Sequence, residues 1–246
     1  MSASSEAVAA TDRDAKPAPD AAPADRTPSD WPPAPPGGWP LRTARLELRP
    51  VRLEDATAMA DYRGIPAVTS FVPFEPQSVA DVETAIRDRW NRVTETGGNV
   101  ELVAELDGRV VGDVVVFWHA ADDDSRGDRP APGAAHGARG GDGAGEGAPR
   151  ADAAHGSAEI GWVVHPEVGG RGLATEAAGA LIDYAFGALG IRRLVARVDA
   201  LNAPSRRVCE KLGMRAEAHL LENEWFKGRW GDEVDYALLA RERRAH

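Results

Sequence analysis

The most informative stretch of the chain is Glu159-Ile-Gly-Trp-Val-Val-His-Pro-Glu-Val-Gly-Gly-Arg-Gly-Leu-Ala-Thr-Glu176. Its first residues form an apolar run typical of a buried strand, which ends at His165-Pro166. The glycines predict a turn, and apolar residues at three- and four-residue spacing predict a helix from about Leu173. A glycine turn that opens a helix leaves backbone N–H groups without carbonyl partners, next to the positive end of the helix dipole. The stretch therefore predicts a site for phosphate oxygens, to which Arg171 adds a full positive charge.

The glycine spacing does not match two common phosphate-binding motifs. No Gly-Lys-Ser/Thr follows the turn, which argues against a mononucleotide-binding P-loop. The order Gly169-Gly-Arg-Gly-Leu-Ala174 also differs from the G-x-G-x-x-G of dinucleotide-binding folds. On spacing alone, an ordinary strand-to-helix turn explains the glycines equally well.

Three motifs together resemble the GNAT superfamily of acetyl-CoA-dependent N-acetyltransferases. They are Glu159-Ile-Gly-Trp-x-x-x-Pro166, Gly170-Arg-Gly-Leu-Ala-Thr-Glu-Ala177 and Asn202-x-x-Ser-x-x-Val-x-Glu-Lys-Leu-Gly-Met214. The opening Leu41-Arg-Thr-Ala-Arg-Leu-Glu-Leu-Arg-Pro50 and the closing Trp225-Phe-Lys-Gly-Arg-Trp230 are similar to the RimJ/RimL branch, which acetylates N-terminal amines of ribosomal proteins. The resemblance covers residues 41–243, apart from one insertion.

Strands and helices that alternate along the chain predict an α/β or α+β domain. Asp107-Gly108 predicts a hairpin between strands at Val100–Leu106 and Val110–Trp118. The resemblance implies a mixed, mainly antiparallel sheet flanked by helices and splayed between its fourth and fifth strands, with acetyl-CoA in the gap. Asp55 is expected to cap a short helix over 56–63, and a second helix is expected over 78–92.

Two stretches of the chain are too poor in large apolar residues to join a core. Residues 1–40 hold nine of the 18 prolines, and residues 121–157 hold nine of the 26 glycines. Both are predicted to be disordered, which leaves a GNAT domain at 41–243 with a disordered insertion at 121–157. Trp31 and Trp39 favour a tail that docks on the domain, or a partner-binding motif.

The charge and the single cysteine restrict the function classes. The formal net charge is −10, and the part outside the tail and the insertion is mildly acidic, so we expect no nucleic-acid partner. Cys209 alone permits no internal disulfide, and no His/Asp/Glu spacing predicts a metal site. Neither a signal peptide nor a membrane-length apolar run is present, so we expect a cytoplasmic protein. The sequence does not decide the oligomeric state, and a homodimer is compatible with it.

The resemblance implies which residues bind acetyl-CoA. Backbone N–H groups of the turn would hold the diphosphate, an N–H of Val163 or Val164 would polarise the thioester carbonyl, and Asn202 would contact the pantetheine arm. Asn202 is equally a helix cap. The turn residues expected to bind the cofactor are Gly170, Arg171, Gly172, Leu173, Ala174 and Thr175. Gly169 stands where many family members have Gln or Arg, which removes one side-chain contact.

The acid and the base of the reaction are also implied by the resemblance. Ser205 matches the RimL-type serine proposed to protonate the departing thiolate, whereas many relatives use a tyrosine at the position of Cys209. Glu224 matches a glutamate of the RimL branch and is the candidate base, with Glu159 as its rival. Ser205 is also a candidate cap, and either glutamate could be an exposed residue without a role.

The expected function is transfer of acetyl from acetyl-CoA to a primary amine by direct attack, and the leading acceptor is a protein N-terminal α-amine. One alternative is a small-molecule amine such as an aminoglycoside or a polyamine. Another is a non-catalytic module that binds acyl-CoA as a sensor. The acceptor pocket is expected to involve Phe71 and Phe74, whose surroundings the sequence does not reveal.

Overall fold

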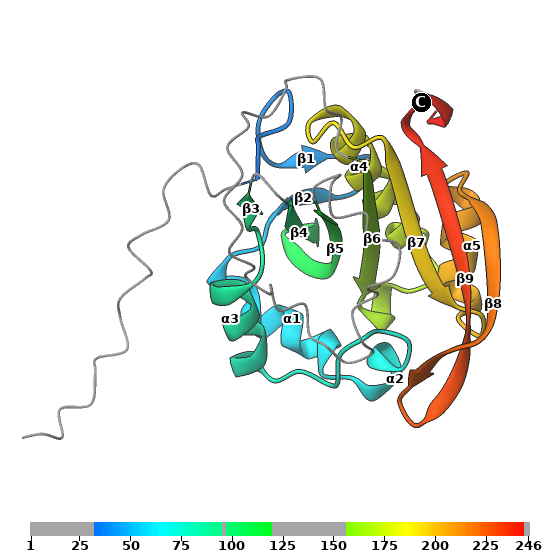
Figure 1. Ribbon diagram of the computed structural model, residues 1–246. Helices are drawn as coiled ribbons and strands as arrows, with labels where there is room; N and C mark the ends of the chain where they lie inside the picture. Colours follow the sequence, from blue (N-terminus) through cyan, green and yellow to red (C-terminus); the bar gives the residue numbers. More distant parts are fainter. Residues whose placement is uncertain (1–31, 95–96, 120–155, 244–246) are drawn as a thin grey trace, which may run out of the picture.

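A computed structural model of the chain describes residues 32–94, 97–119 and 156–243 (Figure 1). The predicted disorder of the tail and insertion falls mainly on residues 1–31 and 120–155, which lie outside the described residues. The end of the tail contacts the domain: the Tyr184 hydroxyl donates to the Pro33 carbonyl at 2.8 Å. The Trp39 ring lies 5.2 Å from the Tyr184 ring, centroid to centroid. Residues 32–40 therefore pack against the helix that carries Tyr184.

The strands form one mixed sheet with the order β1-β2-β4-β5-β6-β7-β9-β8, and β3 pairs with β4. All neighbouring pairs are antiparallel except β6 with β7. The bounds are β1 Leu41–Arg42, β2 Glu47–Pro50, β3 Val93–Thr94, β4 Gly97–Leu106, β5 Arg109–His119, β6 Ser157–Val164, β7 Arg193–Asp199, β8 Arg215–Phe226 and β9 Arg229–Leu239. The expected mixed, mainly antiparallel sheet is confirmed.

Helices cover both faces of this sheet (Figure 1). Side chains of α4 and α5 join the larger core on one face, and side chains of α1 and α3 join the smaller core on the other. The bounds are α1 Ala56–Arg63, α2 Pro66–Thr69, α3 Val79–Asp88, α4 Leu173–Gly187 and α5 Ala203–Lys211. Leu181 and Ile182 of α4 are fully buried, as their spacing predicts.

The sheet opens between β6 and β7. The two strands pair only from Ser157 to Glu159, opposite Arg193 to Val195. Beyond these residues β6 pairs with β5 alone, up to Val164, while β7 continues along β9. The ribbons of β6 and β7 diverge toward the bottom of Figure 1. The expected splay is confirmed: β6 and β7 are the fourth and fifth strands of the sheet when the two-residue β1 is not counted, and the gap opens toward the C-terminal ends of both.

Some boundaries differ from the expected ones. Asp55 precedes α1 but makes no side-chain cap to it; its carboxylate instead accepts bonds from the Arg52 N–H at 2.7 Å and from Arg49 at 2.8 Å. Arg49 binds the Asp55 carboxylate better than a backbone N–H of α1 would, because its charged guanidinium bonds to both carboxylate oxygens. The α3 helix begins as expected, where the side chains of Ser78 and Asp81 cap each other's backbone, but it ends at Asp88.

A buried charged cluster fixes α1 against the sheet. Arg63 donates to Glu101 of β4 and to Asp113 of β5, both at 2.6 Å, and all three side chains are at most 5% exposed. The Tyr62 hydroxyl donates to the same Asp113 at 2.6 Å. The Phe74 ring lies 4.8 Å from the Arg63 guanidinium, so Phe74 lines this cluster on one side. Burial raises the pKa of Glu101 well above its usual range although Arg63 opposes this shift.

Candidate active site

The turn after β6 has the conformation that its glycines permit. The Val168 N–H donates to the His165 carbonyl at 3.1 Å and the Gly169 N–H to the Pro166 carbonyl at 2.9 Å, which closes the first bend. Gly170 and Gly172 have φ angles of 74° and 81°, in the left-handed region that favours glycine. Gly172 is the residue immediately before α4, so the strand-to-helix turn is tight.

The turn presents a row of free backbone donors. Within the described part of the chain, the N–H groups of residues 170–175 donate to no acceptor. The first turn of a helix leaves its N–H groups unpaired and adds positive potential, which is the arrangement that binds phosphate oxygens. The Arg171 side chain is exposed beside them. The structure thus places all six predicted turn residues together at the open end of the splay.

Residues outside the predicted site brace the turn. The Thr43 hydroxyl donates to Glu176 at 2.5 Å, and the Arg45 Nε donates to the same carboxylate at 2.7 Å. Arg45 also donates through Nη1 to the Arg171 carbonyl at 2.9 Å. Thr43 and Arg45 lie in the N-terminal motif, but their pairing with α4 spans more than 130 residues and has no local signal.

Val163 and Val164 lie at the end of β6 and differ in the direction of their N–H groups. The His165 N–H donates to the Val111 carbonyl of β5 at 2.8 Å. Backbone groups alternate sides along an antiparallel strand, so the Val163 N–H also points toward β5. The Val164 N–H points the other way, toward the side from which β7 has diverged. Val164 is therefore the valine with a donor facing the splay.

Asn202 and Ser205 begin α5, beyond the end of β7. The Asn202 side-chain oxygen accepts from the Ser205 N–H at 3.2 Å, so Asn202 is the N-cap of the helix. This bond leaves the amide NH₂ of Asn202 free to donate to a ligand. The Ser205 hydroxyl is half-buried and has no hydrogen-bond partner among the described residues.

The two candidate bases lie on the same face of the sheet but far apart. Glu159 is opposite Val195 and forms an ion pair with Arg197. Glu224 lies opposite Gly231 of β9. Val195, the residue opposite Glu159, pairs with Ala237, which lies six residues further along β9. Six residues of strand span roughly 20 Å, so the two carboxylates cannot serve the same amine. Glu224 is half-buried, and its carboxylate has no partner within the described residues.

The hairpin that carries Glu224 is bonded to the end of α2 and to the segment that follows it. The Lys227 ammonium donates to the Thr69 carbonyl at 2.6 Å and to the Phe74 carbonyl at 2.8 Å. Phe71, between them in sequence, is 37% exposed. The tip of the β8–β9 hairpin lies near α2 in Figure 1. The bonds of Lys227 thus place the hairpin that carries Glu224 beside the Phe71–Phe74 segment.

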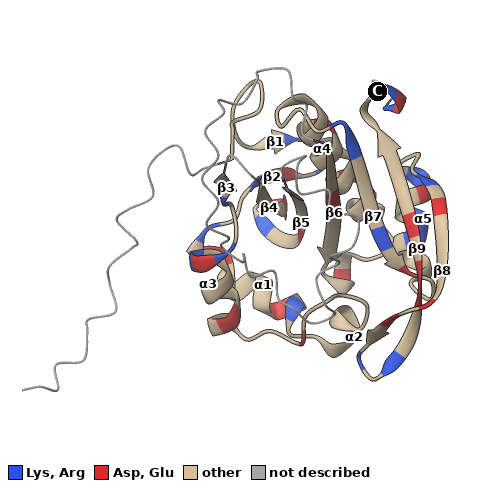
Figure 2. Ribbon diagram, viewed as in Figure 1, with Lys and Arg blue, Asp and Glu red and all other residues tan. Residues whose placement is uncertain are grey.

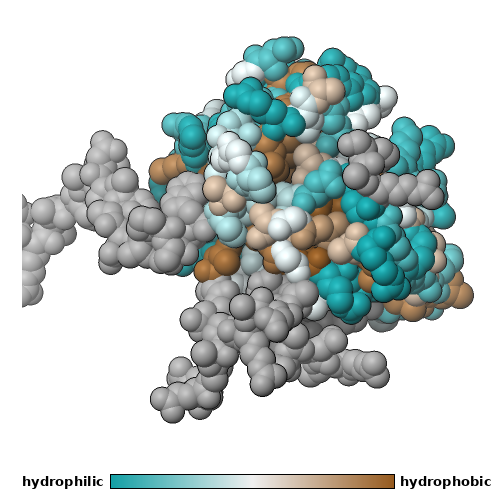
Figure 3. Space-filling model, turned by 90° about the horizontal axis from the view of Figure 1, so that it is seen from above, coloured by the Kyte–Doolittle hydropathy of each residue, from teal (hydrophilic) through white to brown (hydrophobic). Residues whose placement is uncertain are grey.

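The charges around this hairpin are mixed. Arg229 pairs with Asp199 of β7, and basic and acidic segments alternate over β7, β9 and β8 in Figure 2. On the face of the molecule drawn in Figure 3, small groups of hydrophobic residues are interspersed with hydrophilic residues. Trp225 and Trp230 at the hairpin are more than half exposed, and their rings contact each other edge to face at 5.6 Å.

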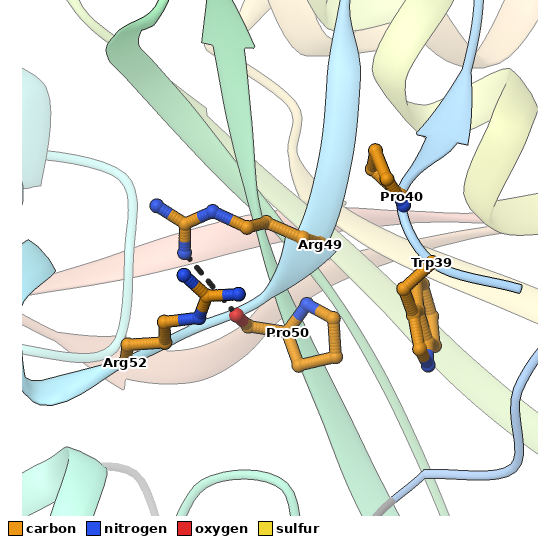
Figure 4. Close-up of a pocket in the computed structure, with 5 residues that line it drawn as sticks. All are labelled: Trp39, Pro40, Arg49, Pro50 and Arg52. Atoms are coloured by element: carbon orange, nitrogen blue, oxygen red, sulfur yellow. Dashed lines mark hydrogen bonds between the residues drawn. The ribbon is translucent and has the colours of Figure 1, made fainter.

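Cys209, where the family resemblance led us to expect a tyrosine in many relatives, is closed off from solvent. Its side chain is fully buried in the larger core, and burial raises the pKa of its thiol to about 12. A concave pocket elsewhere on the surface is lined by Trp39, Pro40, Arg49, Pro50 and Arg52 (Figure 4). None of the predicted site residues lines it, and Arg49 there is engaged with Asp55 and Glu105.

The fold and the turn together define the class of protein: an open mixed sheet, split between parallel strands, with unpaired backbone N–H donors among the described residues where the split opens. The family model described as "Acetyltransferase (GNAT) domain" matches residues 45–215. The chain therefore belongs to the GNAT acetyltransferase family, a family of acyltransferase enzymes.

Two curated relatives illustrate the similarity. The chain is 28% identical over 207 residues to an uncharacterized N-acetyltransferase, p20, of Bacillus licheniformis, which covers 82% of this chain and 97% of that protein. It is 39% identical over 84 residues to an uncharacterized N-acetyltransferase, YnaD, of Bacillus subtilis. That second match covers 34% of this chain and about half, 49%, of the relative's length.

Two solved structures share the fold. Mycobacterium smegmatis RimJ in complex with CoA-disulfide has a TM-score of 0.57 and 24% identity, over 81% of this chain and 84% of that chain. Vibrio cholerae spermidine N-acetyltransferase in complex with CoA and spermine has a TM-score of 0.59 and 19% identity, over 82% of this chain and 99% of that chain. No helix among the described residues is long and apolar enough to cross a membrane.

Proposed function

We propose that this protein transfers the acetyl group of acetyl-CoA to a primary amine, and that a protein N-terminal α-amine is the acceptor. The observation that carries the acetyl-CoA assignment is the row of unpartnered N–H groups at residues 170–175, placed where β6 and β7 separate. The solved neighbours that bind CoA have the same fold, which supports this donor. We place the diphosphate on these N–H groups and the pantetheine arm in the splay.

The reaction divides among groups that line the splay. The Val164 N–H, which faces the opening, polarises the thioester carbonyl as a fixed hydrogen-bond donor. Asn202 donates its amide NH₂ to the pantetheine arm while its oxygen caps α5. The amine then attacks the carbonyl carbon, the C–S bond breaks, and the products are the N-acetylated amine and free CoA.

Glu224 is the base in this proposal, and Ser205 returns the proton to the thiolate. Glu224 takes the proton of the attacking amine, directly or through one water, because its carboxylate is partly accessible and unpaired among the described residues. Glu159 is less suited, since Arg197 already binds it. The Ser205 hydroxyl is free of other described partners and begins the same helix that Asn202 caps.

The fold shared with RimJ supports placing the protein nearest the RimJ/RimL branch. We also propose that it acts in the cytoplasm. A polyamine is the second candidate acceptor. It is supported by the shared fold of a spermidine acetyltransferase and by the half-buried carboxylate of Glu224 on the hairpin. We further propose that residues 41–243 form the catalytic domain and that the insertion takes no part in catalysis.

The test is acetyl-CoA turnover, followed by thiol release, against N-terminal peptides, polyamines and aminoglycosides. Selective turnover of peptides supports the N-terminal acceptor. If only a small amine is turned over, the proposed acetyl transfer stands, but the acceptor is a small molecule and not a protein N-terminus. Tight CoA binding without turnover of any amine would contradict the catalytic proposal and favour an acyl-CoA sensor.

A further inference from the structure

A cluster of three side chains joins the turn between β1 and β2 to the first turn of α4. The Glu176 carboxylate accepts the Thr43 hydroxyl at 2.5 Å, the Arg45 backbone N–H at 2.8 Å and the Arg45 Nε at 2.7 Å. The side chain of Glu176 is only 15% exposed, and that of Arg45 is 42% exposed. The carboxylate is therefore held from two directions, and in turn it fixes the Arg45 guanidinium in one orientation.

This fixed guanidinium contacts the backbone of the phosphate-binding turn. Arg45 Nη1 donates to the Arg171 carbonyl at 2.9 Å. A Cβ added at Gly172 would lie 3.7 Å from Arg45 Nη2, so the guanidinium packs directly against the turn. The peptide between Arg171 and Gly172 is planar and trans, and its C=O and N–H point in opposite directions. The bond to Arg45 thus aims the Gly172 N–H away from Arg45.

The same cluster keeps the Glu176 carboxylate ionised. An unpaired carboxylate in the first turn of α4 would repel a diphosphate bound there. Burial acts to raise the pKa of Glu176, but hydrogen bonds from Thr43 and Arg45 outweigh it and the pKa is lowered, so the group is an anion at neutral pH. Arg45 balances this charge while leaving the adjacent N–H groups without a described acceptor.

We propose that Arg45 is a positioning residue for acetyl-CoA: it holds the Arg171–Gly172 peptide so that the turn presents its N–H groups to the diphosphate, and Glu176 and Thr43 orient Arg45 for this task. The inference rests on the proposed use of acetyl-CoA. It assigns a binding role to the β1–β2 turn, which contributes no residue to the predicted site.

The experiment is calorimetric titration of the full-length protein with CoA, which needs no acceptor. Arg45→Ala is expected to weaken CoA binding by about tenfold or more, the scale of a lost charge-assisted hydrogen bond. Arg45→Lys should recover little of this loss, because one ammonium cannot reproduce the fork that binds Glu176 and Arg171 together. Arg42→Ala is the matched control: it removes the same charge from β1 but only an exposed pair with Glu47.

The outcomes separate this inference from the proposed function. If the wild-type protein binds no CoA, the proposed function fails. If the wild type binds CoA and Arg45→Ala binds it equally well, the positioning role is overturned. Full recovery by Arg45→Lys would overturn it too, because charge alone would then suffice.

A second ligand distinguishes positioning from general damage to the fold. Pantetheine carries the thiol arm without phosphates, and ligand-observed NMR can follow its binding at millimolar concentration. Arg45→Ala should leave the affinity for pantetheine unchanged, with the loss confined to CoA. Equal losses for both ligands would contradict a role at the diphosphate.

Discussion

Asn202 caps α5 and is proposed to contact the pantetheine arm, and a pair of substitutions separates these two roles. Asn202→Ala removes both the cap of α5 and the free amide, so it should cost about 1 kcal/mol of stability and also weaken CoA binding. Asn202→Asp keeps a good capping oxygen but loses the NH₂ donor, so stability should hold while CoA affinity falls. Urea unfolding and CoA calorimetry measure the two effects. Wild-type CoA affinity in Asn202→Asp would show that Asn202 is a cap alone.

The two glutamates also predict different kinetics. Glu224→Gln should lower kcat by about 100-fold while leaving the KM for acetyl-CoA nearly unchanged, because a base acts in the chemical step. Glu159→Gln should reduce kcat by less than about threefold, since Glu159 is engaged with Arg197 at the closed end of the splay. If Glu159→Gln lowered kcat more than Glu224→Gln did, Glu159 would be the base instead.

At the scale of single residues, the sequence predicted the turn well because its chemistry is local. Glycines with left-handed φ angles and the first N–H groups of a helix are consecutive in the chain, so Gly170 to Thr175 could be named in advance. The bonds from Thr43 and Arg45 to Glu176 could not, because they join segments that are distant in sequence. The choice between Val163 and Val164 also required the pairing of β6 with β5.

The packing of α1 onto β4 and β5 depends on the buried Arg63 cluster. Arg63→Ala would leave Glu101 and Asp113 buried without their cation, so it should destabilise the protein by about 3–5 kcal/mol. Arg52→Ala, which removes an exposed pair with Glu54, should change stability by less than about 0.5 kcal/mol. Urea unfolding compares the two variants, and similar small effects would show that the cluster does not hold α1.

Most elements were predictable because each has its own pattern. Asp107-Gly108 marked the hairpin of β4 and β5, and Ser78 with Asp81 marked the start of α3. The side chain of Asp55 was the exception: local rules favour a helix cap there, whereas Arg49 captures it from the adjacent strand. An ion pair with a strand residue six positions earlier overrides the local preference for a helix cap, and the capping pattern alone does not reveal it.

The whole molecule should tolerate loss of the segment between β5 and β6. The ends of these strands are paired, with Trp118 directly opposite Ala158, so a short turn can join them. Replacement of residues 120–155 by a four-residue glycine-containing turn should leave CoA affinity within about threefold, because closing the shorter loop costs little. A larger loss would show that this segment contributes to CoA binding.

Calorimetry of two glycine variants tests most directly whether the turn before α4 binds the diphosphate of CoA. Gly172→Ala and Gly190→Ala both place a side chain at a left-handed φ, 81° and 64°, so each carries a similar strain of about 1–2 kcal/mol. Gly190 follows α4, away from the turn. We expect wild type and Gly190→Ala to bind CoA equally, and Gly172→Ala to bind it at least about tenfold more weakly, since the N–H groups of the turn are displaced. Equal CoA affinity in all three proteins, or none in the wild type, would contradict diphosphate binding by this turn.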